Sequence, residues 1–183
     1  MIAVRRLSAR TAPMPSSIYL AVDTPDMARA LSLASAVRPH VGGLKLGLEF
    51  FAAQGPTGIE RMALLGLPLF LDLKLHDIPA TVAAAVRAAA IKGVELMTVH
   101  ASGGAEMLRA AVAAAGGVRL LGVTVLTSLD ERDLASVGQS APVADQVLRL
   151  AQLARASGLA GVVCSPLEVA ALRAKLGPQA LLV

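Results

Sequence analysis

The sequence predicts an α/β fold, a (β/α)8 TIM barrel whose C-terminal strand or strands are missing from the 183 residues shown. Two observations support this fold. Short apolar runs alternate along the chain with longer segments rich in Ala and Leu, as expected for parallel strands with helices outside. Seven such strands in one chain favour a closed barrel over an open sheet. A closed barrel needs eight strands and usually about 250 residues, so we expect the chain shown to stop within the seventh strand.

The predicted strands are the short apolar runs, which come in the order 18–22, 44–47, 69–74, 96–100, 120–126, 161–164 and 180–183. The predicted helices are the longer segments between and after them, at 25–38, 49–65, 79–92, 103–115, 143–157 and 166–176. Pro79 suits the first turn of its helix, where the missing N–H costs nothing. From the second helix onward, each helix is followed by glycine, the residue that most often ends a helix. These glycines are Gly66, Gly93, Gly116, Gly117, Gly158 and Gly177.

Composition limits the class of protein. We expect residues 18–183 to form a single domain and residues 1–17, which hold three Arg and no acid, to be a flexible N-terminal extension. Outside that extension 14 basic and 13 acidic side chains remain, and the chain has no Trp, so we expect no nucleic-acid partner. The longest stretches without a charged residue, 11–22 and 156–167, are too short to cross a bilayer, so we expect no membrane partner.

The most informative stretch runs from Asp72 to Thr81, where two carboxylates and one ammonium lie within six positions at the end of an apolar run. Side chains alternate across a strand, so Asp72 and Lys74 share one face, while Asp77 falls on the loop before the next helix. Nearby negative charge favours the protonated ammonium, whereas a Schiff-base lysine must lose its proton. Lys74 is therefore interpreted as a proton donor or charge anchor. An ordinary salt bridge at a strand end is the alternative.

Other polar residues fall at the carboxyl ends of predicted strands, where barrel enzymes build their active sites. They are Asp23, Lys45, His100 and Thr127, the last followed by Ser128. Each has a simpler explanation: Asp23 and Thr24 suit a helix N-cap, Lys45 a surface lysine, and His100 a bond to nearby backbone. Their joint placement at one rim is the stronger argument for a site.

The segment Asp72-Leu73-Lys74-Leu75-His76-Asp77-Ile78-Pro79-Ala80-Thr81 closely resembles the signature of the orotidine 5'-phosphate decarboxylase family. The resemblance covers nearly the whole chain from about residue 18 to 183. The short pattern Asp-x-Lys-x-x-Asp is shared with related sugar-phosphate enzymes, whereas the His-Asp-Ile-Pro-x-Thr extension is much more specific to the decarboxylase.

The resemblance implies a role for each candidate residue. It implies that Asp23 binds the ribose, that Lys45 belongs to a charged network, and that Thr127 lies at the pyrimidine. Asp72 would face the substrate carboxylate and Lys74 would protonate the product carbanion. The implied catalytic residues are Lys74, Asp72, Asp77 and Lys45. The implied substrate-binding residues are Asp23, Lys45, Asp72, Leu73, Lys74, Leu75, His76, Asp77, Ile78, Pro79, Ala80, Thr81 and Thr127.

By this resemblance the protein is a carboxy-lyase of pyrimidine biosynthesis that converts orotidine 5'-phosphate to uridine 5'-phosphate, the last step of de novo UMP synthesis. The resemblance implies no metal and no organic cofactor, and a homodimer in which Asp77 and Thr81 reach the neighbouring site.

A single cysteine, Cys164, excludes an intrachain disulfide and fits a cytoplasmic location; its apolar neighbours predict an inert thiol.

Two alternatives stay open from the sequence. One is a metal-dependent sugar-phosphate decarboxylase or synthase of the same barrel group, and the other is a non-catalytic nucleotide-binding fragment. The family's phosphate-binding elements follow strands seven and eight, beyond Val183, and the turn at Gly103 and Gly104 is interpreted only as a tight turn. We expect a chain ending at Val183 to be nearly inactive, which intact mass and turnover measured on one sample would test.

Overall fold

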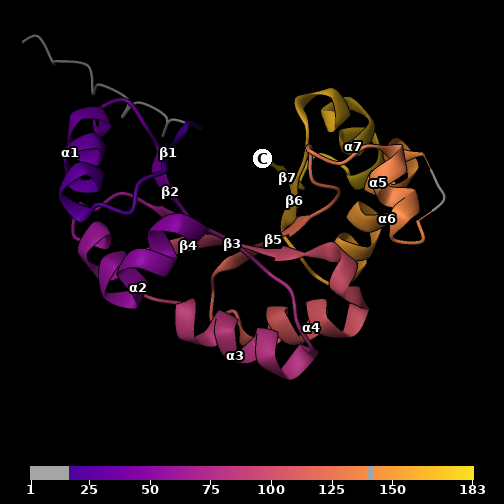
Figure 1. Ribbon diagram of the computed structural model, residues 1–183, viewed down its shortest axis with the longest axis horizontal. Coiled ribbons are helices and arrows are strands. Elements are labelled where there is room, and N and C mark those ends of the chain that lie inside the picture. Colours follow the sequence, from indigo (N-terminus) through magenta and orange to yellow (C-terminus); the bar gives the residue numbers. More distant parts are fainter. Residues whose placement is uncertain (1–16, 140–141) are drawn as a thin grey trace, which may run out of the picture.

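A computed structural model describes residues 17–139 and 142–183, so the predicted N-terminal extension lies, except for Ser17, outside the described residues. The described chain alternates strands with helices around one curled parallel sheet (Figure 1). Strands β1 to β7 are Tyr19–Val22, Gly43–Gly47, Leu69–Leu75, Val94–His100, Arg119–Val123, Gly161–Val163 and Leu181–Leu182. Each strand pairs with the next one in sequence, in the order β1-β2-β3-β4-β5-β6-β7. This parallel, sequential order is that of a (β/α)8 barrel.

The helices lie on the outer, convex side of the sheet (Figure 1). Helices α1 to α7 are Met27–Val37, Leu48–Ala63, Pro79–Ala89, Gly104–Ala114, Glu131–Ser136, Val143–Ala156 and Val169–Leu176. Short 3-10 helices, Ala101–Gly103 and Pro166–Glu168, precede α4 and α7. In the described part of the chain no helix has the length and apolar character needed to span a membrane.

The main core lies between the sheet and the helices. Alternate residues of the central strands, such as Leu44 and Leu46 in β2 or Met97 and Val99 in β4, are fully buried against the apolar faces of the helices. A smaller apolar cluster fills the inner side of the sheet and consists of Phe70, Leu96 and Leu121, with Tyr19, Val163 and Leu181 packed against it. Side chains alternate across a strand, so the polar residues that lie between these helix-facing apolar residues point toward the barrel interior.

The predicted elements are all present, with shifted ends and one omission. Helix α5 was not expected from the sequence, because its six residues are too short and too polar for an apolar period to appear. Its start is stabilised by Asp130, whose carboxylate accepts from the N–H groups of Arg132 and Asp133. The strand predicted over 120–126 ends at Val123, because β6 offers only three residues for pairing.

Candidate active site

Four charged side chains meet at the carboxyl ends of β1, β2 and β3. The Nζ atom of Lys45 lies 3.7 Å from Oδ1 of Asp23 and 3.7 Å from Oδ2 of Asp72. The Nζ atom of Lys74 donates to the same Oδ2 of Asp72 at 2.7 Å. We call Asp23, Lys45, Asp72 and Lys74 the charged cluster. Its two ammonium groups share one carboxylate, which holds like charges close together.

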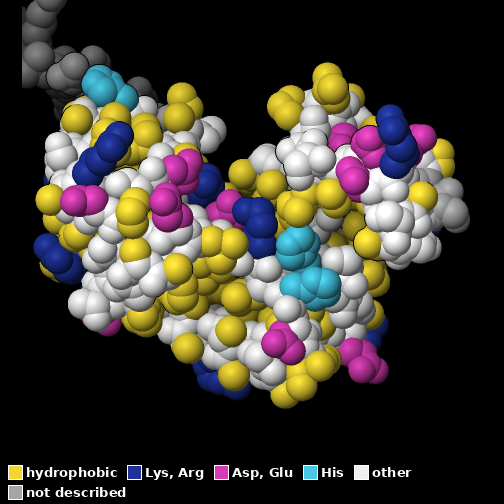
Figure 2. All heavy atoms as spheres, in the orientation of Figure 1, with side chains coloured by type: hydrophobic (Ala, Val, Ile, Leu, Met, Phe, Trp, Pro, Cys, Tyr) yellow, Lys and Arg dark blue, Asp and Glu magenta, His cyan; other side chains and the backbone are white. Residues whose placement is uncertain are grey.

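The strand register explains why residues far apart in sequence meet. Lys45 pairs with Ala21 on β1 and lies two residues before Gly47, which pairs with Asp72 on β3. Parallel strands point their carboxyl ends to the same rim, so one inward position on each strand reaches a common centre. Figure 2 shows Lys or Arg side chains beside acidic and histidine side chains in the hollow of the molecule. The Lys45 side chain is 26% exposed and that of Asp72 is 15% exposed, so both are partly shielded from water.

The backbone of β3 is irregular where the charged cluster forms. Lys74 has φ of 51°, and it is the one non-glycine residue with positive φ in the parts of the chain that the structure describes. The pairing of β3 with β4 shifts between Leu71 and Leu75, which places the irregularity around Lys74. A left-handed backbone at a non-glycine residue costs of order 1–3 kcal/mol, and such strain collects at functional sites. Plain strand alternation therefore does not by itself account for how Lys74 reaches Asp72.

Thr98 of β4 contacts this irregular segment, although it is not among the candidate residues predicted from the sequence. Its hydroxyl accepts from the backbone N–H of Lys74 at 2.8 Å and donates to Oδ1 of Asp72 at 3.0 Å. Thr98 is fully buried. A threonine within an apolar strand is ordinary for its strand propensity, so the sequence contains no signal that separates it from a core residue.

The residues after β3 lie at the rim. Asp77 is exposed, and its carboxylate accepts from the backbone N–H of Ile78 at 2.6 Å. Among the described residues no ion pair joins Asp77 to Lys74, so within one chain the ammonium has Asp72 as its acidic partner rather than both acids. Thr81, in the first turn of α3, is also exposed.

His100 and His76 form a ring contact beside the charged cluster, with centroids 5.4 Å apart and planes tilted by 39°. The pKa of His100 is lowered from its ordinary value of 6.5, first by burial and then by the nearby charges of His76 and Lys74, against an opposing effect of Asp72. A neutral His100 is therefore favoured in the folded protein. The simple alternative of a bond from the His100 side chain to nearby backbone does not appear among its described contacts.

Of the two other strand-end candidates, Asp23 belongs to the charged cluster, whereas Thr127 has no described contact with it. Asp23 is 69% exposed and pairs with Lys45. It does not cap α1, because Asp26 does so by accepting from the N–H of Arg29 at 2.7 Å. Thr127 is exposed on the loop after β5, and no described contact joins it to the charged cluster.

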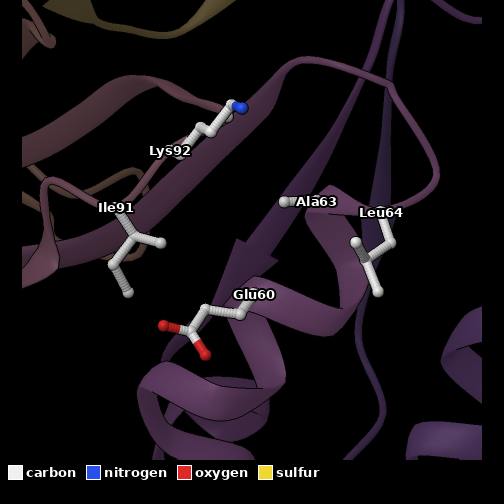
Figure 3. Close-up of a pocket in the computed structure, with 6 residues that line it drawn as sticks. Glu60, Ala63, Leu64, Ile91 and Lys92 are labelled. Carbon is white, nitrogen blue, oxygen red and sulfur yellow. The ribbon is translucent and has the colours of Figure 1, made fainter.

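A cavity of about 690 Å³ lies between the end of α2 and the loop before β4, lined by Glu60, Ala63, Leu64, Ile91, Lys92 and Gly93 (Figure 3). It is at the amino ends of the strands, away from the charged cluster.

Cys164 is half-buried, and burial raises the pKa of its thiol, in line with the predicted inert thiol. Within residues 17–139 and 142–183, no group of three or more His, Cys, Asp or Glu side chains is arranged to hold a metal ion.

A family model and similar proteins of known name point to one family. The model of the orotidine 5'-phosphate decarboxylase / HUMPS family matches residues 16–183. Orotidine 5'-phosphate decarboxylase from Paramagnetospirillum magneticum is 54% identical over 179 residues, covering 93% of this chain and 76% of the relative. The enzyme of the same name from Anaeromyxobacter dehalogenans is 59% identical over 167 residues, covering 91% of this chain and 74% of the relative.

Solved structures agree with the fold. The crystal structure of orotidine 5'-phosphate decarboxylase from Lactobacillus acidophilus matches with a TM-score of 0.82 and 36% identity, covering 90% of this chain and 78% of that one. An uncharacterized conserved protein from Geobacillus kaustophilus matches with a TM-score of 0.85 and 35% identity, covering 90% of this chain and 80% of that one. The predicted barrel class and the resemblance carried by Asp72 to Thr81 are thus confirmed. By its sequence, its fold and the family model that spans it, this chain belongs to the orotidine 5'-phosphate decarboxylase / HUMPS family.

Proposed function

We propose that this protein decarboxylates orotidine 5'-phosphate to uridine 5'-phosphate and carbon dioxide. The observation that carries the proposal is the contact of the Lys74 ammonium with Asp72, with Lys45 beside the same carboxylate. The high identity to relatives named for this activity supports the substrate. The metal-dependent sugar-phosphate reaction is less favoured, since the relatives from Paramagnetospirillum magneticum and Anaeromyxobacter dehalogenans are both named orotidine 5'-phosphate decarboxylase.

The chemistry follows from the charges. Breaking the bond between C6 of the pyrimidine and its carboxylate releases carbon dioxide and leaves the electron pair on C6. A fixed ammonium at Lys74 stabilises that charge as it develops and then delivers a proton to C6, giving the C–H bond of the product. Preorganised charge of this kind is usually the largest catalytic contribution, because the site does not have to reorganise during the reaction.

Asp72 acts in two ways in this proposal. It fixes the Lys74 ammonium through the 2.7 Å contact. It also faces the carboxylate of the substrate, so repulsion that is present before the reaction disappears when carbon dioxide leaves. Lys45 limits the cost of holding Asp72 in place, because its ammonium lies 3.7 Å from the same oxygen.

The remaining assignments concern binding. Asp23 accepts from the ribose hydroxyls, and its exposed position beside Lys45 leaves it open to a ligand. Thr127 bonds the pyrimidine from the loop after β5. The segment from Leu73 to Thr81 forms the wall of the site between the ribose, at Asp23, and the pyrimidine, at Thr127. We further propose that residues 18–183 act as one domain in the cytoplasm and that the reaction uses neither metal nor organic cofactor.

The direct test is turnover of orotidine 5'-phosphate by the protein expressed from its complete gene. The reaction is followed at the pyrimidine absorbance with and without a chelator, and the product is identified as uridine 5'-phosphate. Equal rates in both conditions support the proposal. Loss of activity with chelator and its return with Mg²⁺ would favour metal-dependent chemistry, and nucleotide binding without turnover would favour a binding role.

The proposed homodimer places Asp77 and Thr81 of each chain in the site of the other. Both residues are exposed in the single chain, beside Ile78, which is 66% exposed. Mixing an inactive Lys74→Ala chain with an inactive Asp77→Ala chain tests this arrangement. With random pairing in a two-fold dimer, about a quarter of all sites regain both intact residues, so activity returns on mixing. No recovery from chains that do exchange would contradict the shared site.

A further inference from the structure

We infer that Thr98 is a positioning residue that holds both Asp72 and Lys74 in their catalytic geometry. The inference rests on the proposed function and extends it to a side chain that lies in the neighbouring strand β4. Thr98 itself does not touch the ammonium of Lys74 in the described contacts. It acts through the backbone of Lys74 and through the carboxylate of Asp72.

The direction of each hydrogen bond is determined by what the partners can donate. The backbone N–H of Lys74 donates to the Thr98 oxygen at 2.8 Å, so that oxygen serves as acceptor. The hydroxyl proton of Thr98 is then free to point at Oδ1 of Asp72, 3.0 Å away. A carboxylate can only accept, so this orientation satisfies both groups at once.

Each of the two carboxylate oxygens of Asp72 thereby has its own hydrogen-bond donor. Oδ1 accepts from Thr98, whereas Oδ2 accepts from the Lys74 ammonium at 2.7 Å. With one donor on each oxygen, rotation of the carboxylate breaks at least one bond. The position of the lysine ammonium thus depends on a hydroxyl that is outside its own strand.

The same hydroxyl supports the irregular backbone of β3. The register shift between Leu71 and Leu75 takes the Lys74 amide out of the regular ladder with β4. Its partly buried N–H needs another acceptor, because an amide that is shielded from water and unpaired is costly. Thr98 supplies that acceptor at the one non-glycine residue with left-handed φ in the described parts of the chain. The contact therefore stabilises the conformation that brings Lys74 to Asp72.

A purely structural role is the competing explanation, since Thr98 is fully buried. Three variants separate the two. Thr98→Val keeps the shape and removes the hydroxyl, and Thr98→Ser restores the hydroxyl without the methyl group. Thr124→Val is the matched control: Thr124 is 4% exposed, its hydroxyl donates to the Val163 carbonyl at 3.2 Å, and it contacts no member of the charged cluster.

The measurements are kcat, the Kd of uridine 5'-phosphate and Tm, made on the protein from its complete gene. We expect Thr98→Val to lower kcat about 10- to 100-fold while product affinity changes by less than about threefold, because misplacement of a reacting group affects the chemical step. Thr98→Ser should recover most of kcat. Thr124→Val should lower Tm with little change in kcat. Unchanged kcat in Thr98→Val, or equal losses in kcat and affinity that serine does not restore, would overturn the inference.

Hydrogen exchange of the Lys74 amide keeps the test independent of turnover. The amide should be protected in the unaltered protein and in Thr98→Ser, and should exchange faster in Thr98→Val. If the unaltered protein lacks turnover, the proposed function fails, whereas this protection pattern still supports Thr98 as the residue that positions Lys74. Equal exchange in all three proteins would overturn the positioning role.

Discussion

The Nζ atom of Lys74 lies 2.7 Å from Oδ2 of Asp72, although the backbone between the two residues departs from regular strand geometry. Two side chains at i and i+2 of a regular strand point the same way but stand apart along the strand. At Lys74 the left-handed φ of 51° alters the direction of the chain where the contact forms. The protein accepts local strain in order to place an ammonium against a carboxylate at the rim of the barrel.

Replacing Lys74 by Ala should abolish proton delivery to C6. We expect kcat to fall by about 10³-fold or more, since general acids alone contribute about 10²- to 10⁴-fold and this ammonium also stabilises charge. The same group removes the C6 proton in the reverse direction, so exchange of the C6 hydrogen of uridine 5'-phosphate with deuterium from solvent should also stop. Lys92→Ala, on the exposed loop before β4, removes an equal charge and should change neither rate. Exchange that persists in Lys74→Ala would contradict the assignment.

Replacing Lys45 by Met should leave Asp23 and Asp72 without the ammonium between them. The length of the side chain is kept and the charge is lost, so we expect kcat/KM to fall about 10- to 100-fold, or ~1.4–2.7 kcal/mol. Asp23→Asn removes one of the two carboxylates that Lys45 contacts at 3.7 Å. The double variant should therefore lose less than the two single losses combined. Strictly additive losses in this cycle would show that the 3.7 Å contacts carry no coupling.

Stability should depend on pH through His100. Its pKa is lowered in the folded protein, chiefly by burial, so folding favours the neutral imidazole. This contribution is fully present above the unfolded pKa of about 6.5 and is lost as pH falls below that value through the lower folded pKa. As pH falls below about 6.5, Tm of the unaltered protein should consequently drop more steeply than Tm of His100→Asn. His76→Asn should give an intermediate slope, because the charge of His76 contributes to the shift. Parallel curves would refute the role of His100.

The start of α1 offers a test of local stability away from the site. Asp26 caps this helix by accepting from the N–H of Arg29 at 2.7 Å. Asp26→Ala should lower the free energy of unfolding by about 1 kcal/mol, which corresponds to roughly 2–4 °C in Tm for a chain of this size. Asp26→Asn retains a side-chain oxygen and should stay within a few tenths of a kcal/mol. Equal losses in both variants would show that the cap is not the cause.

The strand and helix order could be predicted from the sequence because each element carries its own local signal. Apolar runs mark the strands, and glycines such as Gly66 and Gly177, both with positive φ, follow the helices. Helix α5 lacked such a signal, since it depends on the cap at Asp130 rather than on an apolar period.

The residues of the candidate site likewise divide into those that a local sequence signal indicates and those that only the fold reveals. Asp72, Lys74 and Asp77 are close in sequence, so their density alone indicated chemistry. Asp23 and Lys45 were selected from their place at strand ends, and only the parallel register brings Lys45 within 3.7 Å of both acids. Thr98 could not be selected, because a threonine in an apolar strand has no local feature that reveals its partners.

By itself the sequence determined the barrel class, the family and the residues that carry charge, because apolar period and charge density are local properties of the chain. The tertiary structure decided which charges meet. It paired Lys74 with Asp72 rather than with Asp77, and it gave Lys74 a left-handed backbone conformation within β3. It also placed the Thr98 hydroxyl between the backbone of Lys74 and the carboxylate of Asp72. Such contacts depend on strand register and on a backbone irregularity, and both arise only when neighbouring strands pack together.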